Sequence, residues 1–142
     1  MRKLKIHTLN KGWCDKDEVL LHAAFQILVD FVEREKPGKV IDWNSDKNHK
    51  KAWREIRALY KWWKKKRPAR KDPLYNKKLK VPPLKFKKIS GTDLSEMVRP
   101  DKKRYSKYYK ALKDSTTLEK QWHEEDQLHL HRLIDIRPYL WT

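Results

Sequence analysis

The chain has 142 residues, a net charge of +17 and 39% charged residues, yet it also contains seven Trp, six Tyr and three Phe. Disordered chains are poor in aromatic residues, so the composition indicates a folded domain whose core is rich in large rings. The single cysteine, Cys14, excludes an intramolecular disulfide, and three widely separated glycines exclude a glycine-rich phosphate loop. We expect one domain, residues 1–142, in a reducing compartment.

Almost all of the net charge lies in one stretch of the chain. Between Lys47 and Lys88 there are 18 Lys and Arg against two acids, so this stretch carries +16 of the total +17. A charge that serves only solubility is usually spread along a chain, whereas a concentrated one indicates a polyanionic partner. The longest apolar tract, Val19–Val32, is interrupted by polar residues and is too short to span a bilayer, so no membrane partner is expected.

The first predicted helix covers Asp15–Lys36. Asp15 can cap its first turn, and Glu18 follows three residues later, as a capping box requires. The dipeptide at 37–38, Pro-Gly, ends the helix. Apolar residues cover most of its circumference, which predicts that this helix is the centre of the core.

A second long helix is predicted over Asp46–Lys66, with Ser45 or Asp46 as its cap. At 100° per residue its apolar side chains fall within about a third of the circumference. They are Ala52, Trp53, Ile56, Leu59, Tyr60 and Trp63. The opposing side, called the basic face below, consists of Lys47, Lys50, Lys51, Arg54, Arg57, Lys61, Lys64 and Lys65. Trp62 is predicted to be exposed at the edge of the basic face.

The basic face is the strongest functional signal in the sequence. Cations about 5 Å apart along a helix can neutralise several phosphates at once, and an exposed Trp62 ring suits stacking on a base. The alternative is a solvated surface, but such surfaces usually mix both signs, and here eight bases meet one acid, Glu55. We predict nucleic acid, either DNA or structured RNA, as the partner, contacted mainly through its phosphates.

The segment after this helix, residues 67–92, is predicted to be an extended basic arm. It contains four prolines and has no helical period, and its pieces KKLKV and LKFKKI alternate like short edge strands. Its first cations, Arg67, Arg70 and Lys71, would extend the footprint of the basic face. The alternative is a flexible loop that its charge keeps solvated.

Two further helices are predicted, over Asp101–Lys113 and from Thr116 to about Arg137. The second would begin with a capping box formed by Thr116 and Glu119. With these elements, the predicted fold class is all-α: a compact bundle of about four helices with an extended, Pro- and Lys-rich central segment.

No catalytic residue, metal ligand or cofactor is predicted. Glu125 and His129 have the i, i+4 spacing of helical metal ligands, but the second Glu-x-x-His element that a di-iron bundle needs is missing. We expect these two residues at a seam between helices. No serine lies in a glycine-rich elbow, and Cys14 has no evident partner base. A nuclease assembled from distant Asp, Glu and His residues is the remaining enzymatic alternative.

Four segments of the chain resemble a group of small uncharacterised proteins of tailed bacteriophages. They read GWCDKDEVLLHAAFQILVDFVERE, IDW, AWREIRALYKWW and HRLIDIRPYLWT. The resemblance carries no function, but it implies a viral protein in the cytoplasm of a bacterial host or in the virion. Three hypotheses follow: a nucleic-acid-binding protein, a structural or assembly protein of the virion, or an inhibitor that binds a host protein or ribonucleoprotein.

Overall fold

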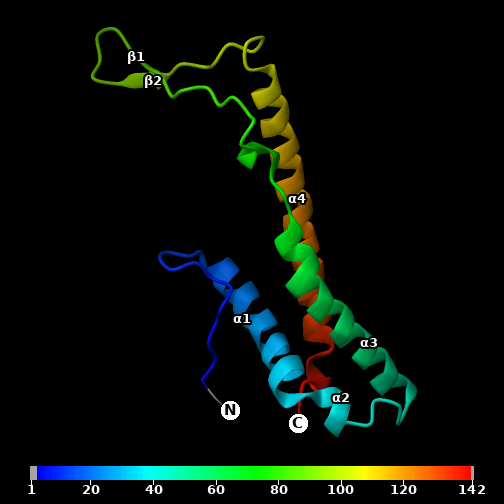
Figure 1. Ribbon diagram of the computed structural model, residues 1–142. Coiled ribbons are helices and arrows are strands. Elements are labelled where there is room, and N and C mark those ends of the chain that lie inside the picture. The colour runs from blue at the N-terminus through cyan, green and yellow to red at the C-terminus, as the bar shows by residue number, and fades with distance from the viewer. Residues whose placement is uncertain (1–2, 142) are drawn as a thin grey trace. The chain divides into compact units, whose positions relative to one another are not determined.

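The computed structural model describes residues 3–141 and divides the chain into two compact units (Figure 1). Unit 1 combines the chain up to Arg70 with the segment from His123 onward, and unit 2 is Lys71–Trp122. Within residues 3–141 there are four α-helices, several short 3-10 and π-helical turns, and one two-stranded antiparallel sheet. The sequence predicted an all-α fold. The two-stranded sheet makes the fold mostly α instead. The prediction of a single domain stays a prediction.

The first predicted helix is present as α1, Lys16–Asp30, which continues into a π-helical turn, Phe31–Glu35. Asp15 occupies the N-cap position, but its carboxylate makes no capping hydrogen bond, so the predicted capping box is wrong. Lys36 has a left-handed backbone, with φ of 51°, and leads into the short helix α2, Pro37–Val40. The left-handed backbone at Lys36 ends the helical segment that begins with α1, close to the predicted boundary.

The second predicted helix is α3, Lys47–Lys61, extended by a π-helical turn, Trp62–Lys66, and a 3-10 turn, Arg67–Ala69. Asp46 caps it, as predicted, because its carboxylate accepts hydrogen bonds from the backbone N–H groups of Asn48 at 2.7 Å and His49 at 2.9 Å. These bonds satisfy two of the N–H groups that a helix start leaves without an intrahelical partner.

The core of unit 1 lies between α1, α3 and the last turns of α4, the long helix Ser106–Asp135. Phe25 and Leu28 of α1 are completely buried, in agreement with a central role for this helix. The ring of Phe25 stacks on that of Trp63, with centroids 4.5 Å apart. The predicted apolar side of α3 faces this core: Ala52, Ile56, Leu59 and Trp63 are buried, and Trp53 and Tyr60 pack against it.

Helix α4 is continuous, whereas the sequence had predicted two helices with a break near residues 114–115. The predicted cap, Thr116, lies inside the helix and donates its hydroxyl to the carbonyl of Leu112 at 2.9 Å. Neither Gly nor Pro occurs between Lys113 and Thr116, so nothing in the backbone stops the helix from propagating. The predicted capping box at this place is wrong.

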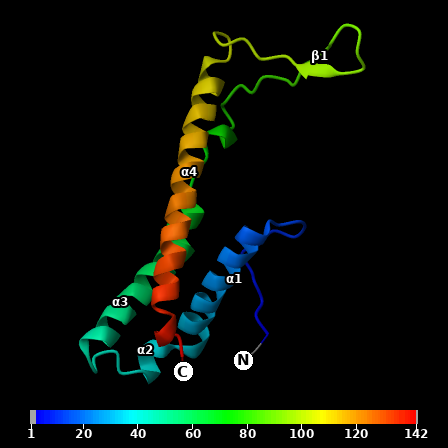
Figure 2. The same cartoon turned by 180° about the vertical axis from the view of Figure 1, so that it is seen from behind.

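Unit 2 contains the extended segment that the sequence predicts, together with the start of α4. Strand β1, Phe86–Lys88, pairs in antiparallel register with β2, Ser95–Met97, and the hairpin projects away from the N-terminal end of α4 (Figure 2). Strand β1 lies in the predicted LKFKKI piece, but the KKLKV piece forms no strand. Among residues 3–141, no helix is long and apolar enough to cross a membrane.

Candidate nucleic-acid interface

The basic face of α3 is exposed to solvent along its whole length. All eight of its side chains are exposed, while Ala52, Ile56 and Leu59 on the opposite side of the helix are buried. The helical period in the sequence therefore placed these side chains correctly. From Lys47 to Lys65 the helix rises about 27 Å at 1.5 Å per residue, and cations three or four residues apart are separated by about 5 Å along the axis.

Most of the cations on the basic face have no acidic partner. Lys64 is the exception, because its ammonium group lies 3.0 Å from a carboxylate oxygen of Glu33. A hydrogen bond from Tyr60 and another from Lys64 lower the pKa of Glu33, so this acid stays ionised. Within residues 3–141, the other seven members of the face form no ion pair. The guanidinium of Arg57 lies over the ring of Trp53, 5.5 Å from its centroid, and stays exposed.

The single acid of α3, Glu55, is held by an arginine of α4. Both carboxylate oxygens of Glu55 accept hydrogen bonds from Arg132, through Nε and Nη2, the latter at 3.0 Å. The Arg132 hydrogen bond lowers the pKa of Glu55, and a bidentate pair of this kind fixes the carboxylate in one orientation. The basic face is thus left without a neutralising carboxylate from its own helix.

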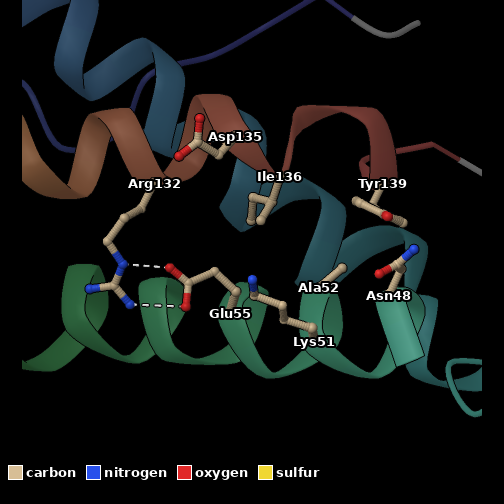
Figure 3. Close-up of a pocket in the computed structure, with 8 residues that line it drawn as sticks. All are labelled: Asn48, Lys51, Ala52, Glu55, Arg132, Asp135, Ile136 and Tyr139. Atoms are coloured by element: carbon tan, nitrogen blue, oxygen red, sulfur yellow. Dashed lines mark hydrogen bonds and ion pairs between the residues drawn. The ribbon is translucent and has the colours of Figure 1, made fainter. Parts of the chain in front are cut away.

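Beside this ion pair lies a cleft of about 360 Å³ between α3 and the end of α4 (Figure 3). Its charged lining comprises two cations, Lys51 and Arg132, and two acids, Glu55 and Asp135. The charges balance, so the cleft has no electrostatic preference for an anion. Only Lys51 belongs to both the cleft and the basic face. The cleft is therefore not part of the candidate interface.

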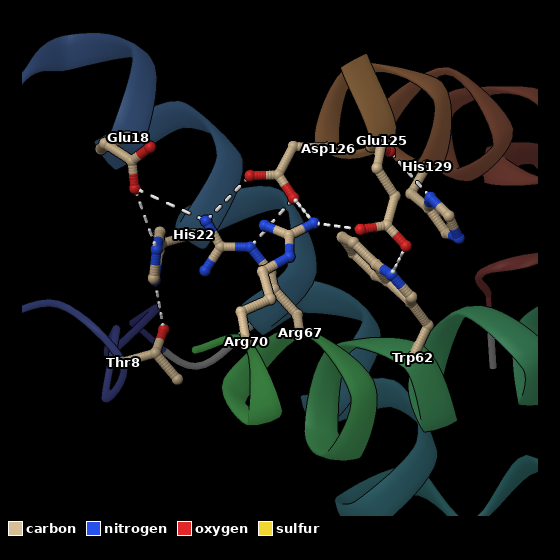
Figure 4. Close-up of polar contacts among 9 residues, drawn as sticks. All are labelled: Thr8, Glu18, His22, Trp62, Arg67, Arg70, Glu125, Asp126 and His129. Carbon is tan, nitrogen blue, oxygen red and sulfur yellow. Dashed lines mark hydrogen bonds and ion pairs between the residues drawn. The ribbon is translucent and has the colours of Figure 1, made fainter. Parts of the chain in front are cut away.

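Trp62 does not lie at the edge of the basic face, and the prediction that it is exposed is wrong. It is 4% exposed, donates its indole N–H to a carboxylate oxygen of Glu125 at 2.9 Å, and stacks on His129 with ring centroids 3.9 Å apart (Figure 4). The π-helical turn begins at Trp62, where the step of 100° per residue no longer applies. A buried ring in these contacts is not available to stack on a base.

Arg67 and Arg70 are also turned inward, toward α4. Arg67 binds both carboxylate oxygens of Asp126, at 3.1 and 3.0 Å, and Arg70 lies 2.8 Å from one of them and also binds Glu125 (Figure 4). The two arginine side chains are only 19% and 15% exposed. Burial raises the pKa of the Asp126 carboxyl, but the hydrogen bonds from both arginines outweigh it and lower the pKa overall. These two cations are therefore left out of the candidate interface.

The polar contacts around Arg67 continue to the non-helical segment that precedes α1, through Glu18, His22 and Thr8. Glu18 lies 3.7 Å from Arg67 and 3.3 Å from His22 Nε2, while His22 Nδ1 is 2.7 Å from the hydroxyl of Thr8 (Figure 4). Burial, followed by the nearby charge of Arg67, lowers the pKa of His22. The neutral imidazole thus bridges α1 and the segment before it, which gives these contacts a structural role.

Glu125 and His129, the pair with metal-ligand spacing, have other partners. The carboxylate of Glu125 accepts from Trp62 and Arg70, and His129 donates from Nδ1 to the backbone carbonyl of Glu125 at 2.8 Å. In the part of the chain that the structure describes, no group of three or more His, Cys, Asp or Glu side chains is arranged to hold a metal ion. The two residues lie at the seam between α3 and α4, where the sequence analysis expected them.

Unit 2 carries a second concentration of positive charge. It has 15 Lys and Arg against six acids, a net charge of +9. Lys71, the last of the predicted site residues, is exposed at its first position. The cations of Lys102–Lys113 were not predicted as part of the site, because the acids of the C-terminal third dilute their charge in the sequence.

Comparison with protein-family models, with curated proteins and with solved structures finds no match to the chain. The resemblance to proteins of tailed bacteriophages therefore stays a prediction. The candidate interface rests on the exposure and charge of the side chains described above.

Proposed function

We propose that the protein binds nucleic acid, DNA or structured RNA, through phosphate contacts made by the basic face of α3. The observation that supports this is the row of seven exposed cations without an acidic partner, on a helix whose own acid, Glu55, is held by Arg132. Such a row is electrostatically unfavourable in isolation and becomes favourable beside a polyanion, since binding releases condensed counterions.

The proposed mode of binding is tolerant of sequence. Lys residues predominate on the basic face, and they act as point charges on phosphates rather than as readers of base edges. The proposed role is that of a binding protein rather than an enzyme. Its proposed place of action is the bacterial cell that a phage infects, or the virion.

A charge-reversal experiment tests the proposal. The variant Arg54→Glu, Arg57→Glu, Lys61→Glu reverses three neighbouring exposed cations of the basic face, none of which is buried. We expect the wild-type protein to bind a DNA duplex with a slope of log K against log salt of about −5, as five or six phosphate contacts imply. The variant should bind all sequences more weakly by a similar factor, and its slope should be smaller by about three.

The matched control is Lys11→Glu, Lys16→Glu, Lys39→Glu, which makes the same change in net charge at three exposed positions of unit 1 outside the basic face. It should retain most of the affinity and the salt slope. Equal losses in the two triple variants would show that net charge alone matters and that the basic face is not the site. A wild-type protein that binds neither DNA nor RNA at low salt would contradict the proposed function itself.

A further inference from the structure

The β1–β2 hairpin of unit 2 is a ribbon with both faces in solvent. Beyond the three paired residues of each strand, Ile89 N–H donates to Leu94 O at 3.0 Å and Val98 N–H to Lys85 O at 2.8 Å. Every residue of both strands is exposed. A two-stranded hairpin is only marginally stable in water, and here neither face is covered by other parts of unit 2. The ribbon is therefore a surface that is suited to a partner.

Both faces of the ribbon carry exposed apolar side chains, but only one of them carries an acid. Phe86 and Met97 are directly opposite each other on one face, where they are 66% and 58% exposed, and Lys88 opposite Ser95 continues that face. The other face carries Lys87 opposite Glu96 and, beyond the paired residues, the exposed apolar side chains of Ile89, Leu94 and Val98. Side chains alternate along each strand, so the only acid of the two strands is on the face away from the apolar pair. We call the face of Phe86, Met97 and Lys88 the wedge face.

The charge around the ribbon indicates what the wedge face contacts. From Lys77 to Arg99 there are seven Lys and Arg against two acids. In a pair of identical chains, two such ribbons would repel each other because both are positively charged. An anionic partner with flat apolar surfaces matches both the charge and the exposed apolar side chains of the ribbon. Duplex DNA has this combination where a base step is partly unstacked, because the flat apolar faces of the bases are then open between two rows of phosphates. A two-stranded ribbon fits the major groove, which is about 12 Å wide.

We propose that the ribbon enters a groove of duplex DNA and bends it, with Phe86 and Met97 pressed as an apolar wedge against a base step. Lys88 and its neighbouring cations hold the phosphates on either side. Apolar side chains that partly unstack a base step kink the duplex by tens of degrees. DNA is favoured over duplex RNA because the A-form major groove is deep and narrow. This inference rests on the proposed function and names its substrate class.

The test measures bending and affinity separately. A DNA duplex of about 30 base pairs carries a donor and an acceptor dye at its ends, so that bending raises the energy transfer between them. The wild-type protein should raise the transfer at saturation. The variant Phe86→Ala, Met97→Ala should bind about ten-fold more weakly or worse, without the rise, and with an unchanged salt slope because no cation is removed.

The control variant, Leu94→Ala, Val98→Ala, shortens two exposed apolar side chains of the ribbon that lie outside the wedge face. It should bend DNA as the wild-type protein does, and Phe86→Leu, which keeps apolar bulk, should retain most of the bending. If both double variants lost DNA bending and affinity equally, the assignment of the wedge to the face of Phe86 and Met97 would be overturned.

Three further outcomes would overturn the inference while leaving the proposed function intact. In the first, the wild-type protein binds the DNA duplex but does not raise the energy transfer. In the second, it binds and bends an RNA duplex as well as a DNA duplex. In the third, poly-glutamate displaces DNA from the ribbon preferentially, which would indicate an acidic protein as the partner. A wild-type protein that binds no nucleic acid at all would instead remove the proposed function on which the inference rests.

Discussion

The indole N–H of Trp62 donates to the carboxylate of Glu125 at 2.9 Å, which joins the last turn of the helical segment begun by α3 to α4. Because Trp62 also stacks on His129 and contacts Phe25, it connects the apolar core of unit 1 to the ion pairs of Glu125 and Asp126 with Arg67 and Arg70. The ring that the sequence offered as a stacking surface for a base is thus a structural element of the interior.

The first prediction concerns the variant Trp62→Leu. It removes the N–H group and most of the buried ring that covers His129, so it should lower the free energy of unfolding by about 2–5 kcal/mol, the usual cost of shortening a large buried side chain. Chemical denaturation measures this. The affinity of the folded variant for single strands should be unchanged, whereas the loss of a base-stacking ring would cost about 1–3 kcal/mol of binding.

An exposed neighbour serves as the control for this experiment. Lys65→Ala should change the free energy of unfolding by no more than about 0.5 kcal/mol, since surface substitutions rarely do more. If Trp62→Leu were as stable as Lys65→Ala but bound nucleic acid poorly, the ring would have to be on the surface.

The position of Trp62 also marks where sequence reasoning ends. The faces of α3 were predictable because a 3.6-residue period sorts Ile56 and Leu59 from Arg54 and Lys61 without knowledge of any partner. The environment of Trp62 was not, since its hydrogen-bond acceptor is 63 residues away in the chain, on another helix.

The second prediction concerns Asp126, which both Arg67 and Arg70 contact. In Asp126→Asn the two guanidinium groups keep their positions but lose the charge between them. Arg70 keeps Glu125 and Arg67 keeps Glu18, so the expected cost is that of the lost charged hydrogen bonds, about 1.5–3 kcal/mol. The thermal melting temperature of the variant should fall accordingly. A fully stable variant would mean that these arginines can turn to solvent, where they would again be available to phosphates.

The two arginines illustrate a further limit of the sequence. Charge and spacing gave Arg67 and Arg70 the same prediction as Arg54 and Arg57, because a cation's sequence neighbours do not reveal whether it faces solvent or an acid. The acids that bind them come from α4, whose own sequence gave only the spacing of Glu125 and His129. The basic face was predictable, but the ion pairs that hold Arg67 and Arg70 against α4 were not.

The third prediction concerns acid. A hydrogen bond from Arg132 lowers the pKa of Glu55, and hydrogen bonds from Arg67 and Arg70 lower the pKa of Asp126. Burial lowers the pKa of His22. A carboxyl whose pKa is lower in the folded state contributes stability above its ordinary value, and this stability is lost as the pH falls through the folded value. The imidazole acts in the same direction, since it is neutral when folded and protonates on unfolding below 6.5.

The free energy of unfolding should therefore decrease continuously between about pH 7 and about pH 3, first through His22 and then through the carboxylates. Denaturation at a series of pH values measures the slope. In Asp126→Asn the acidic part of the slope should be shallower, because one of the carboxylates responsible is absent. A slope that is the same in the variant and the wild type would show that general repulsion among the cations, rather than these ion pairs, governs the acid response.

The fourth prediction distinguishes a helix interior from a helix start at Thr116. Its hydroxyl bonds back to the Leu112 carbonyl within α4, so Thr116→Ala removes no cap and introduces the residue with the highest helix propensity. Its free energy of unfolding should be equal to that of the wild type or higher by about 0.5 kcal/mol. If Thr116 began a separate helix, the same change would cost about 1 kcal/mol. Asp46→Ala, which removes a cap that is present, is the matched comparison and should destabilise unit 1. Chemical denaturation of the two variants side by side decides between a continuous and a divided helix, because only a divided α4 would make both substitutions destabilising.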